Sequence, residues 1–448
     1  MRSSLRLAGL LLAALCVGRS ASAQSTRPER PYRGIFASGV DTAADSLSVT
    51  GNTGVGWDSS TAADTTGADA DSSATAGSSL KGAGYNMFGG SIVYTRSRER
   101  VQFGASAATS GRYYSSLSAP WVMGHSGRVN LGYRKGRSTM FNVAQSVSYQ
   151  PFGSLGLFPG LGDPTAVGPN VLQSAASPDL DTRALRTSYT SSATDAGVEQ
   201  RLSRRSTVSL QYSYRLTRYT EGRGQFHAQD VRGRFNRTLT EHLGLRLGYG
   251  YGESRFVGAS DGYQNHYLDL GVSYNRALSI SRRTVLGFDT SSAGTNDGTR
   301  TRWDILGGAV LTHEIGRTWA LSGAFRRDVQ FIETLRQPIF TDAVNSNLSG
   351  LLSRRVQVNA GAGASSGSLG IQSRDKGVWS YYGTAGMGIA VSRYLQLSAR
   401  YGYYQYRFDD PVYRALGFTQ QMRRHTIGVF VSGWAPLLQK GRRTNASR

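Results

Sequence analysis

Apolar and polar residues alternate with a period of two along most of this chain. In the segment 207–217 the apolar positions are Val208, Leu210, Tyr212, Tyr214 and Leu216, and the residues between them are serine, threonine, glutamine and arginine. Successive side chains of a β-strand point to opposite faces, so such a segment has one apolar and one polar face. No apolar stripe with helical spacing survives in it. The pattern predicts a strand with one face in an apolar environment and the other face in water.

The alternation recurs, and short basic turns punctuate it. Further alternating segments are 128–134, 243–251, 268–275, 319–326 and 395–403. Four turns are near copies of one another, at 202–205, 279–283, 352–355 and 391–394, and four more fill the same place at 95–98, 133–136, 239–242 and 315–317. Longer polar connections, such as 151–181 and 291–299, alternate with these turns. Short turns on one rim and long loops on the other are typical of outer-membrane barrels.

Eight short turns require sixteen strands, and the segments 46–58 and 419–432 add one strand at each end. We therefore predict an all-β fold, a transmembrane antiparallel up-and-down β-barrel of about eighteen strands, with sixteen to eighteen as the expected range. The sheet has to close, because an open edge in lipid leaves N–H and C=O groups unpaired at several kcal/mol each. The alternative is a water-soluble propeller, which would need a motif repeated in every blade.

The two ends of the chain differ from the alternating region. Residues 1–23 have a basic start, a short apolar run over Leu7–Val17 and small residues before Gln24, which predicts a secretory signal peptide. A lipoprotein signal at Cys16 is the alternative, but Leu15 is bulky for the position before a lipidated cysteine. We expect 24–45 to be a periplasmic lead, 46–435 the barrel, and 436–448 a basic periplasmic tail.

Composition narrows the class of partner. The formal charge is +22, and removing the three arginines of the expected signal leaves +19. This excess of positive charge favours anionic partners, but the secretory signal argues against nucleic acid as one of them. The mean hydropathy of −0.34 does not exclude a membrane barrel, because half of each strand faces water. The mature chain has no cysteine, so neither disulfides nor thiol chemistry is expected.

The polar faces are expected to line the lumen. Their basic residues are Arg128, Arg134, Arg215, Arg232, Arg234, Arg246, Arg302, Arg326 and Arg400, and their acidic residues are Asp230, Asp269 and Asp304. Guanidinium groups along a water-filled tube would favour anions. In the alternative interpretation these arginines pair with the aspartates and fill a closed interior.

Aromatic residues on the apolar faces are expected to lie at the membrane interfaces. The candidates are Tyr212, Tyr214, Tyr249, Tyr251, Trp303, Trp319, Tyr381, Tyr401 and Tyr403. The arginines of the short turns are expected to anchor the periplasmic rim, with a specific anion-binding ring there as the alternative.

Sequence gives little support for catalysis. The six histidines are scattered, and neither a G-x-S-x-G nor an H-E-x-x-H motif occurs. We expect no enzyme, no cofactor and no metal. Two alternatives stay open: a hydrolase at the barrel rim, which would need a Ser/His/Asp cluster, and Ca²⁺ binding by the aspartates at 58, 64, 69 and 71, whose spacing is irregular.

From Tyr85 to Trp434, the hairpin rhythm, the strand number and the signal peptide resemble those of outer-membrane porin-like β-barrels, some of which are associated with exopolysaccharide export. The chain departs from the usual terminal aromatic residue, since Trp434 is followed by a basic tail. The resemblance implies a passive channel for hydrophilic, anionic solutes or polysaccharide. Its partners would be outer-membrane lipid and lipopolysaccharide and the barrel-insertion machinery. The alternative is a plugged barrel that acts as a surface scaffold or adhesin through its long loops.

Overall fold

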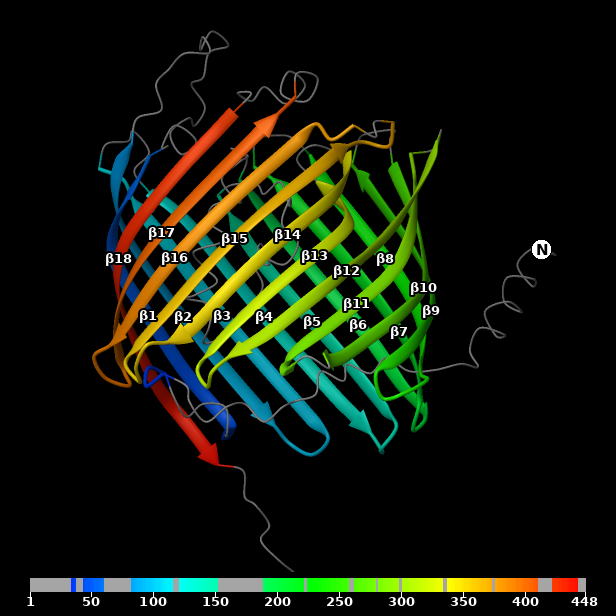
Figure 1. Ribbon diagram of the computed structural model, residues 1–448, viewed down its shortest axis with the longest axis horizontal. Coiled ribbons are helices and arrows are strands. Elements are labelled where there is room, and N and C mark those ends of the chain that lie inside the picture. The colour runs from blue at the N-terminus through cyan, green and yellow to red at the C-terminus, as the bar shows by residue number, and fades with distance from the viewer. Residues whose placement is uncertain are drawn as a thin grey trace, which may run out of the picture.

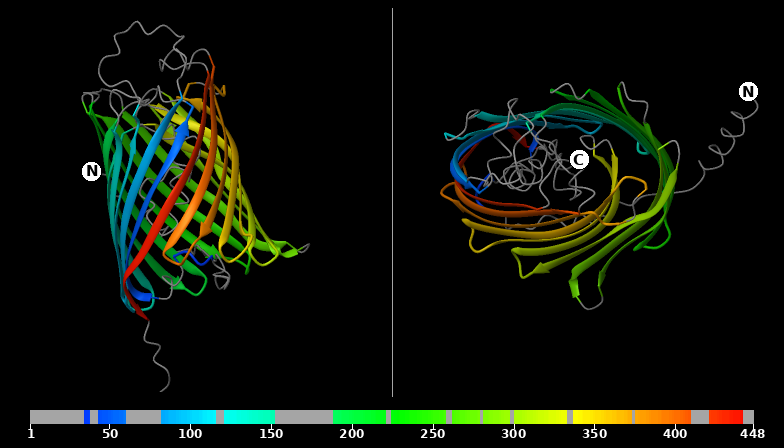
Figure 2. Two further views of the ribbon diagram at one scale, coloured as in Figure 1. Left: turned by 90° about the vertical axis from the view of Figure 1, so that its left-hand side faces the viewer. Right: turned by 90° about the horizontal axis from the view of Figure 1, so that it is seen from above.

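The computed structural model is a closed antiparallel barrel of eighteen strands, tilted with respect to the barrel axis and oval in cross-section (Figures 1 and 2). It describes residues 34–37, 43–59, 82–115, 121–151, 188–220, 224–257, 262–278, 281–297, 300–332, 337–372, 375–409 and 421–441. The predicted fold class and strand number are confirmed. The expected signal peptide, most of the lead, the acidic loop with Asp64, Asp69 and Asp71, and residues 442–448 lie outside the described residues.

Every strand pairs with the strands before and after it in the chain. The strands are β1 (Ala43–Asp58), β2 (Ala83–Ser97), β3 (Val101–Tyr113), β4 (Trp121–Lys135), β5 (Thr139–Gln150), β6 (Tyr189–Ser203), β7 (Ser206–Tyr219), β8 (Gln225–Thr238), β9 (Leu243–Phe256), β10 (Gly262–Leu278), β11 (Ser281–Asn296), β12 (Thr301–Ile315), β13 (Trp319–Ile332), β14 (Gln337–Leu351), β15 (Val356–Leu369), β16 (Val378–Ala390), β17 (Leu395–Phe408) and β18 (Gln421–Gly441). The strand ends that flank the eight predicted short turns lie at one rim, here called the turn rim, and those that flank the longer connections lie at the other, the loop rim (Figure 1).

Closure joins the first strand to the last. β1 pairs with β18 from Ala43 opposite Gly441 to Asp58 opposite Thr426. Each strand thereby has a paired neighbour on both sides, as a sheet in hydrocarbon requires. At the turn rim, Gly136 and Gly316 have φ values of 67° and 63°, a conformation that glycine adopts without steric cost.

The outer face carries the apolar half of the alternation. Exposed apolar side chains occur on strands all around the barrel, among them Val55, Leu131, Val143, Leu210, Leu270, Val344, Leu397 and Val429. A continuous exposed apolar surface on a single-layered sheet is unfavourable in water and favourable in lipid. In the described part of the chain, no helix has the length and apolar character needed to cross a bilayer.

The terminal strands are longer than the alternation predicted. β1 begins at Ala43 rather than 46, and β18 continues to Gly441 instead of ending near 432. In β18 the alternation of apolar and polar residues is interrupted at Pro436, which cannot donate a backbone hydrogen bond. A register shift at Leu47/Ser48 leaves Leu437 as an extra residue beside it, so the strand passes the proline through a bulge.

One seam of the wall is shorter than the others. β12 pairs with β13 only from Gly307 to Ile315, so residues 301–306 of β12 have no partner on β13. Next to it, β10 carries two residues more than β11 between the pairs Leu268–Ser292 and Tyr274–Phe288. Both irregularities lie in the part of the wall that holds the candidate site.

Candidate functional site in the lumen wall

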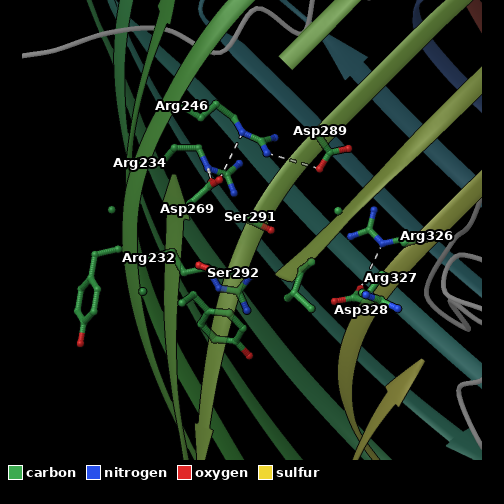
Figure 3. A pocket seen from close by; sticks show the side chains of 16 residues that line it. Arg232, Arg234, Arg246, Asp269, Asp289, Ser291, Ser292, Arg326, Arg327 and Asp328 are labelled. Carbon is green, nitrogen blue, oxygen red and sulfur yellow. Dashed lines mark hydrogen bonds and ion pairs between the residues drawn. The ribbon is translucent and has the colours of Figure 1, made fainter. Parts of the chain in front are cut away.

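Arginines from three strands gather at a recess in the inner face of β8–β13. Five of them line it, together with three aspartates: Arg232, Arg234, Arg246, Arg326, Arg327, Asp269, Asp289 and Asp328. Figure 3 shows them in two groups: Arg234, Arg246, Asp269 and Asp289 meet across neighbouring strands, and Arg326 lies beside Asp328 on a strand further along the wall. We call this set the arginine wall. It brings together four of the nine predicted lumenal arginines.

Asp269 of β10 is the centre of the arginine wall. Its carboxylate forms ion pairs with Arg234 Nε of β8 at 2.6 Å and with Arg246 Nε of β9 at 3.4 Å (Figure 3). Arg246 continues across the sheet to Asp289 of β11 at 3.5 Å and donates to the carbonyl of Thr290 at 2.8 Å. The bulged β10 makes this reach possible at Gly271, where a Cβ would stand 2.0 Å from the Thr290 oxygen.

Three further pairs join residues two apart on one strand. Arg232 contacts Asp230 at 2.8 Å, Arg302 contacts Asp304 at 2.6 Å, and Arg326 contacts Asp328 at 3.2 Å. Residues two apart share a face of a strand, so an Arg-x-Asp or Asp-x-Arg triplet places opposite charges side by side. The sequence carries this signal. It would have identified Asp328, which our sequence prediction left out.

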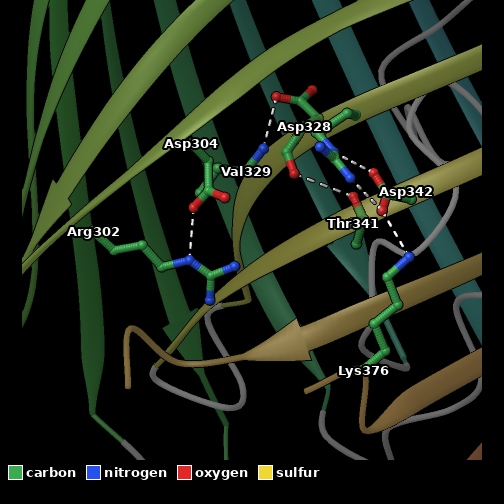
Figure 4. A network of polar contacts seen from close by, with 8 residues as sticks. Arg302, Asp304, Asp328, Val329, Thr341, Asp342 and Lys376 are labelled. Carbon is green, nitrogen blue, oxygen red and sulfur yellow. Dashed lines mark hydrogen bonds and ion pairs between the residues drawn. The ribbon is translucent and has the colours of Figure 1, made fainter. Parts of the chain in front are cut away.

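Arg302 is separate from the arginine wall and is largely buried near the loop rim. Its guanidinium lies 3.6 Å from the centre of the Phe340 ring and donates to Ser368 Oγ at 3.2 Å. Beyond the short β12–β13 seam, Arg327 binds Asp342 through two hydrogen bonds, and Lys376 contacts the same carboxylate at 2.8 Å (Figure 4). The sequence prediction missed Asp342 and Lys376, because strand pairing across a loop brings them together.

The other predicted lumenal arginines do not join this cluster. Arg128 lies on β4, Arg215 on β7, and Arg134 near the β4–β5 turn beside Glu199 and Arg201. Arg400 of β17 lies over the ring of Phe430, 5.6 Å from its centre. The three predicted acids Asp230, Asp269 and Asp304 all pair with predicted arginines.

The opposite part of the inner face is aromatic. Six buried rings lie on β2, β16, β17 and β18: Tyr85, Tyr382, Tyr404, Tyr406, Phe408 and Phe430. We call them the aromatic wall. Tyr404 donates to Tyr406 at 2.8 Å and accepts from Ser380 at 3.0 Å. Within this wall, Arg424 and Asp58 form a buried ion pair, with Nε 3.0 and 3.1 Å from the two carboxylate oxygens.

The predicted interfacial aromatics lie on strands all around the barrel. Tyr212, Tyr249, Tyr251, Trp303, Tyr381 and Tyr401 are among the exposed large side chains, and Tyr214, Trp319 and Tyr403 are half-buried. Trp319 begins β13 at the turn rim, whereas the others lie in the middle of their strands or nearer the loop rim. Their membership of membrane belts stays a prediction.

The histidines form cross-strand pairs and are not gathered at one place. Five of them contact a hydroxyl group on a neighbouring strand: His125 with Thr109, His227 with Tyr214, His266 with Tyr249, His313 with Thr284, and His425 with Tyr401. Such pairs are ordinary contributions to sheet stability. Among the described residues, no group of three or more histidine or acidic side chains has the geometry to hold a metal ion.

The closed sheet, its apolar outer surface and its charged inner face define a transmembrane β-barrel of the bacterial outer membrane. No family model and no curated protein matches the chain. Similar solved structures include Pseudomonas aeruginosa OpdQ (9% identity, TM-score 0.45, 88% of this chain and 98% of that one) and P. aeruginosa OccK2, also called OpdF (9%, 0.46, 91% and 100%). Acinetobacter baumannii OccAB2 is similar at 9% identity and a TM-score of 0.45, over 91% of this chain and 100% of its own.

Proposed function

We propose that the barrel is a channel that lets hydrophilic solutes diffuse across the outer membrane and that favours anions. The observation that carries this proposal is the arginine wall, in which five arginines and three aspartates line one recess. Asp230 and Asp342, which pair with Arg232 and Arg327, raise the number of carboxylates to five, and Lys376 makes the number of cationic groups six, so the net charge of the whole group is +1. Low-dielectric walls around such a set raise the local concentration of the opposite charge.

The ion pairs with aspartate leave some N–H donors of these arginines available. A guanidinium has five N–H donors, and one carboxylate takes at most two of them. The side chains of Arg232, Arg234 and Arg326 keep exposed fractions of 42%, 40% and 55% in their ion pairs. The remaining donors can therefore bind the oxygens of a passing carboxylate, phosphate or sulfate group, in a small solute or along an acidic polysaccharide.

Reversal potentials across planar bilayers test this proposal. We expect the wild-type channel to select chloride over potassium, and the triple variant Arg232→Gln/Arg234→Gln/Arg326→Gln to lose most of that selectivity while still conducting. Arg354→Gln/Arg355→Gln, which changes two exposed arginines at the turn rim, is the matched control and should keep the wild-type ratio. Cation selectivity in the wild type would contradict the proposal.

A plugged barrel is the second candidate, and the aromatic wall is the observation that favours it. Inner-face rings with exposed fractions of 0–8% contribute almost no wet surface to a lumen. The same bilayer experiment separates the two functions. Correctly folded protein that inserts without any conductance steps would support a scaffold that acts through its loops, and would reject the channel.

A further inference from the structure

Four short turns at the turn rim share one construction. In the β14–β15 turn, the Ser353 hydroxyl accepts hydrogen bonds from the backbone N–H groups of Arg355 at 3.2 Å and Val356 at 3.1 Å. Ser203, Thr240 and Ser392 accept in the same way in the β6–β7, β8–β9 and β16–β17 turns, at 3.1–3.3 Å. Hydroxyl-capped turns are locally fixed, so the residues on either side are held in a repeated orientation.

An exposed apolar residue precedes the capping hydroxyl in each of these turns. Leu202, Leu239, Leu352 and Val391 have exposed fractions of 49%, 43%, 65% and 57%. They continue the apolar outer surface of the strands to the edge of the barrel. The four turns therefore lie where hydrocarbon gives way to headgroups.

Basic residues follow the hydroxyl or occupy the neighbouring turns. The exposed ones include Arg98, Arg100, Arg134, Lys135, Arg137, Arg204, Arg205, Arg317, Arg354, Arg355 and Arg393. The exposed acidic residues in the same described turns are Glu99 and Glu241, with Glu199 beside them at the end of β6. The turn rim is thus strongly positive, and its charge lies beside the end of the apolar surface.

The loop rim is built differently. Its arginines include Arg255, Arg302 and Arg424, and each of these forms an ion pair with a carboxylate of this chain. Exposed Arg218, Arg407 and Arg423 also lie there, but so do the acidic residues Asp297, Asp375 and Asp409, so positive and negative charges are closer in number than at the turn rim. At the turn rim Arg98 pairs with Asp45 at 2.7 Å, but the basic side chains there still outnumber the acidic ones.

We propose that the turn rim binds the phosphate groups of anionic phospholipids, with the apolar residue of each turn in the acyl region and the arginines at headgroup height. Guanidinium forks match phosphate oxygens and retain their charge at any physiological pH. The contact would fix the depth of the barrel in the bilayer. This proposal does not depend on conduction, so failure of the channel hypothesis leaves it intact.

Trp319 is placed to report on this contact. It begins β13 on the outer face and lies against Gly350, two residues before the Leu352–Arg355 turn. A protein with Trp319 as its single tryptophan, the other five being changed to phenylalanine, can be refolded into phosphatidylcholine vesicles. Brominated phosphatidylglycerol or brominated phosphatidylcholine is then added, and the two quenching curves give the preference of the site for the anionic lipid.

We expect Trp319 to show about a fivefold preference for the anionic lipid at low salt, since each basic residue near a membrane surface contributes at roughly that level. Arg317→Gln/Arg354→Gln/Arg355→Gln should bring the preference close to one, and the matched Arg→Lys triple should keep part of it. A single-tryptophan protein that retains Trp121, at the loop rim, should show almost none. Heat-modifiable gel mobility confirms folding of each variant.

Three outcomes would overturn the proposal. One is equal quenching by the two lipids at Trp319, and another is the same anionic preference at Trp121 as at Trp319. The third is loss of the preference on adding inorganic phosphate but not on adding sodium chloride at matched ionic strength, which would identify free phosphate as the ligand. Loss of the preference to the same extent with both salts is the expected result.

Discussion

The arginine wall and the aromatic wall lie on opposite sides of one barrel and use the same strand positions in opposite ways. On β8–β13, the inner positions carry charges in pairs whose side chains stay partly exposed. On β16–β18, β1 and β2, the inner positions carry rings that are buried, together with the buried ion pair between Asp58 and Arg424. The period of two therefore divides the two faces of a barrel strand but does not determine whether the inner face is charged or aromatic.

Glycine has a different part in the two walls. In the arginine wall, Gly271 lets Arg246 reach the carbonyl of Thr290. In the aromatic wall, Gly56 lies beneath the Tyr85 ring, with a Cβ position only 2.4 Å from a ring carbon. The missing side chain of Gly271 thus gives space to a charged group, and that of Gly56 gives space to an aromatic ring.

The largest expected difference between the walls is the cost of removing a carboxylate. Asp58→Ala should lower the free energy of unfolding by about 3–5 kcal/mol, because it leaves Arg424 buried without its partner. Asp230→Ala in the half-exposed pair with Arg232 should cost less than about 1 kcal/mol. Urea unfolding of the refolded barrel in phospholipid vesicles measures both.

Asp58→Asn controls for the loss of packing and should fall between these values, since the amide keeps the shape but not the charge. If Asp58→Ala and Asp230→Ala lowered the free energy of unfolding equally, the aromatic wall would be as accessible to water as the arginine wall, and the contrast between the two walls would not hold.

Adding one carbon to a glycine gives the next largest effect. Gly56→Ala should cost about 1–3 kcal/mol, because its Cβ would overlap the Tyr85 ring. Gly84 is the matched control: it lies next to Tyr85 and opposite Trp57, and its Cβ would be 3.8 Å from the nearest atom. Gly84→Ala should therefore change the unfolding free energy by less than about 0.5 kcal/mol. A similar loss in both variants would show that strand glycines matter here for backbone reasons and not for packing.

Sequence alone could predict the barrel, its strand number and its turns, because each depends on local alternation and on short basic connections. It could not predict the aromatic wall. In β17, Tyr401 and Tyr403 continue the apolar outer face, but Tyr404, Tyr406 and Phe408 are buried on the inner one. A run with aromatic residues on both faces has no period of two to read.

The arginine wall was predictable only in part. Sequence selected Arg232, Arg234, Arg246, Arg326 and the central Asp269, and the Arg326–Asp328 triplet could have supplied a further acid. The contact between Arg246 and Asp289 depends on the two extra residues of β10, which shift the pairing with β11. No local pattern reveals a register shift, because strand pairing sets it across the sheet.

The smallest expected effect concerns the ion selectivity of the two walls. Asp269→Asn removes the negative charge shared by Arg234 and Arg246 and leaves both arginines in place. We expect the ratio of chloride to potassium permeability to rise by less than about threefold at physiological ionic strength, because salt screens a single charge within about 8 Å. Asp58→Asn removes the same charge from the aromatic wall and should leave the ratio unchanged, since Asp58 is fully buried. Reversal potentials in a potassium chloride gradient compare the two, and an equal rise in both variants would mean that solutes pass along the whole circumference rather than beside the arginine wall.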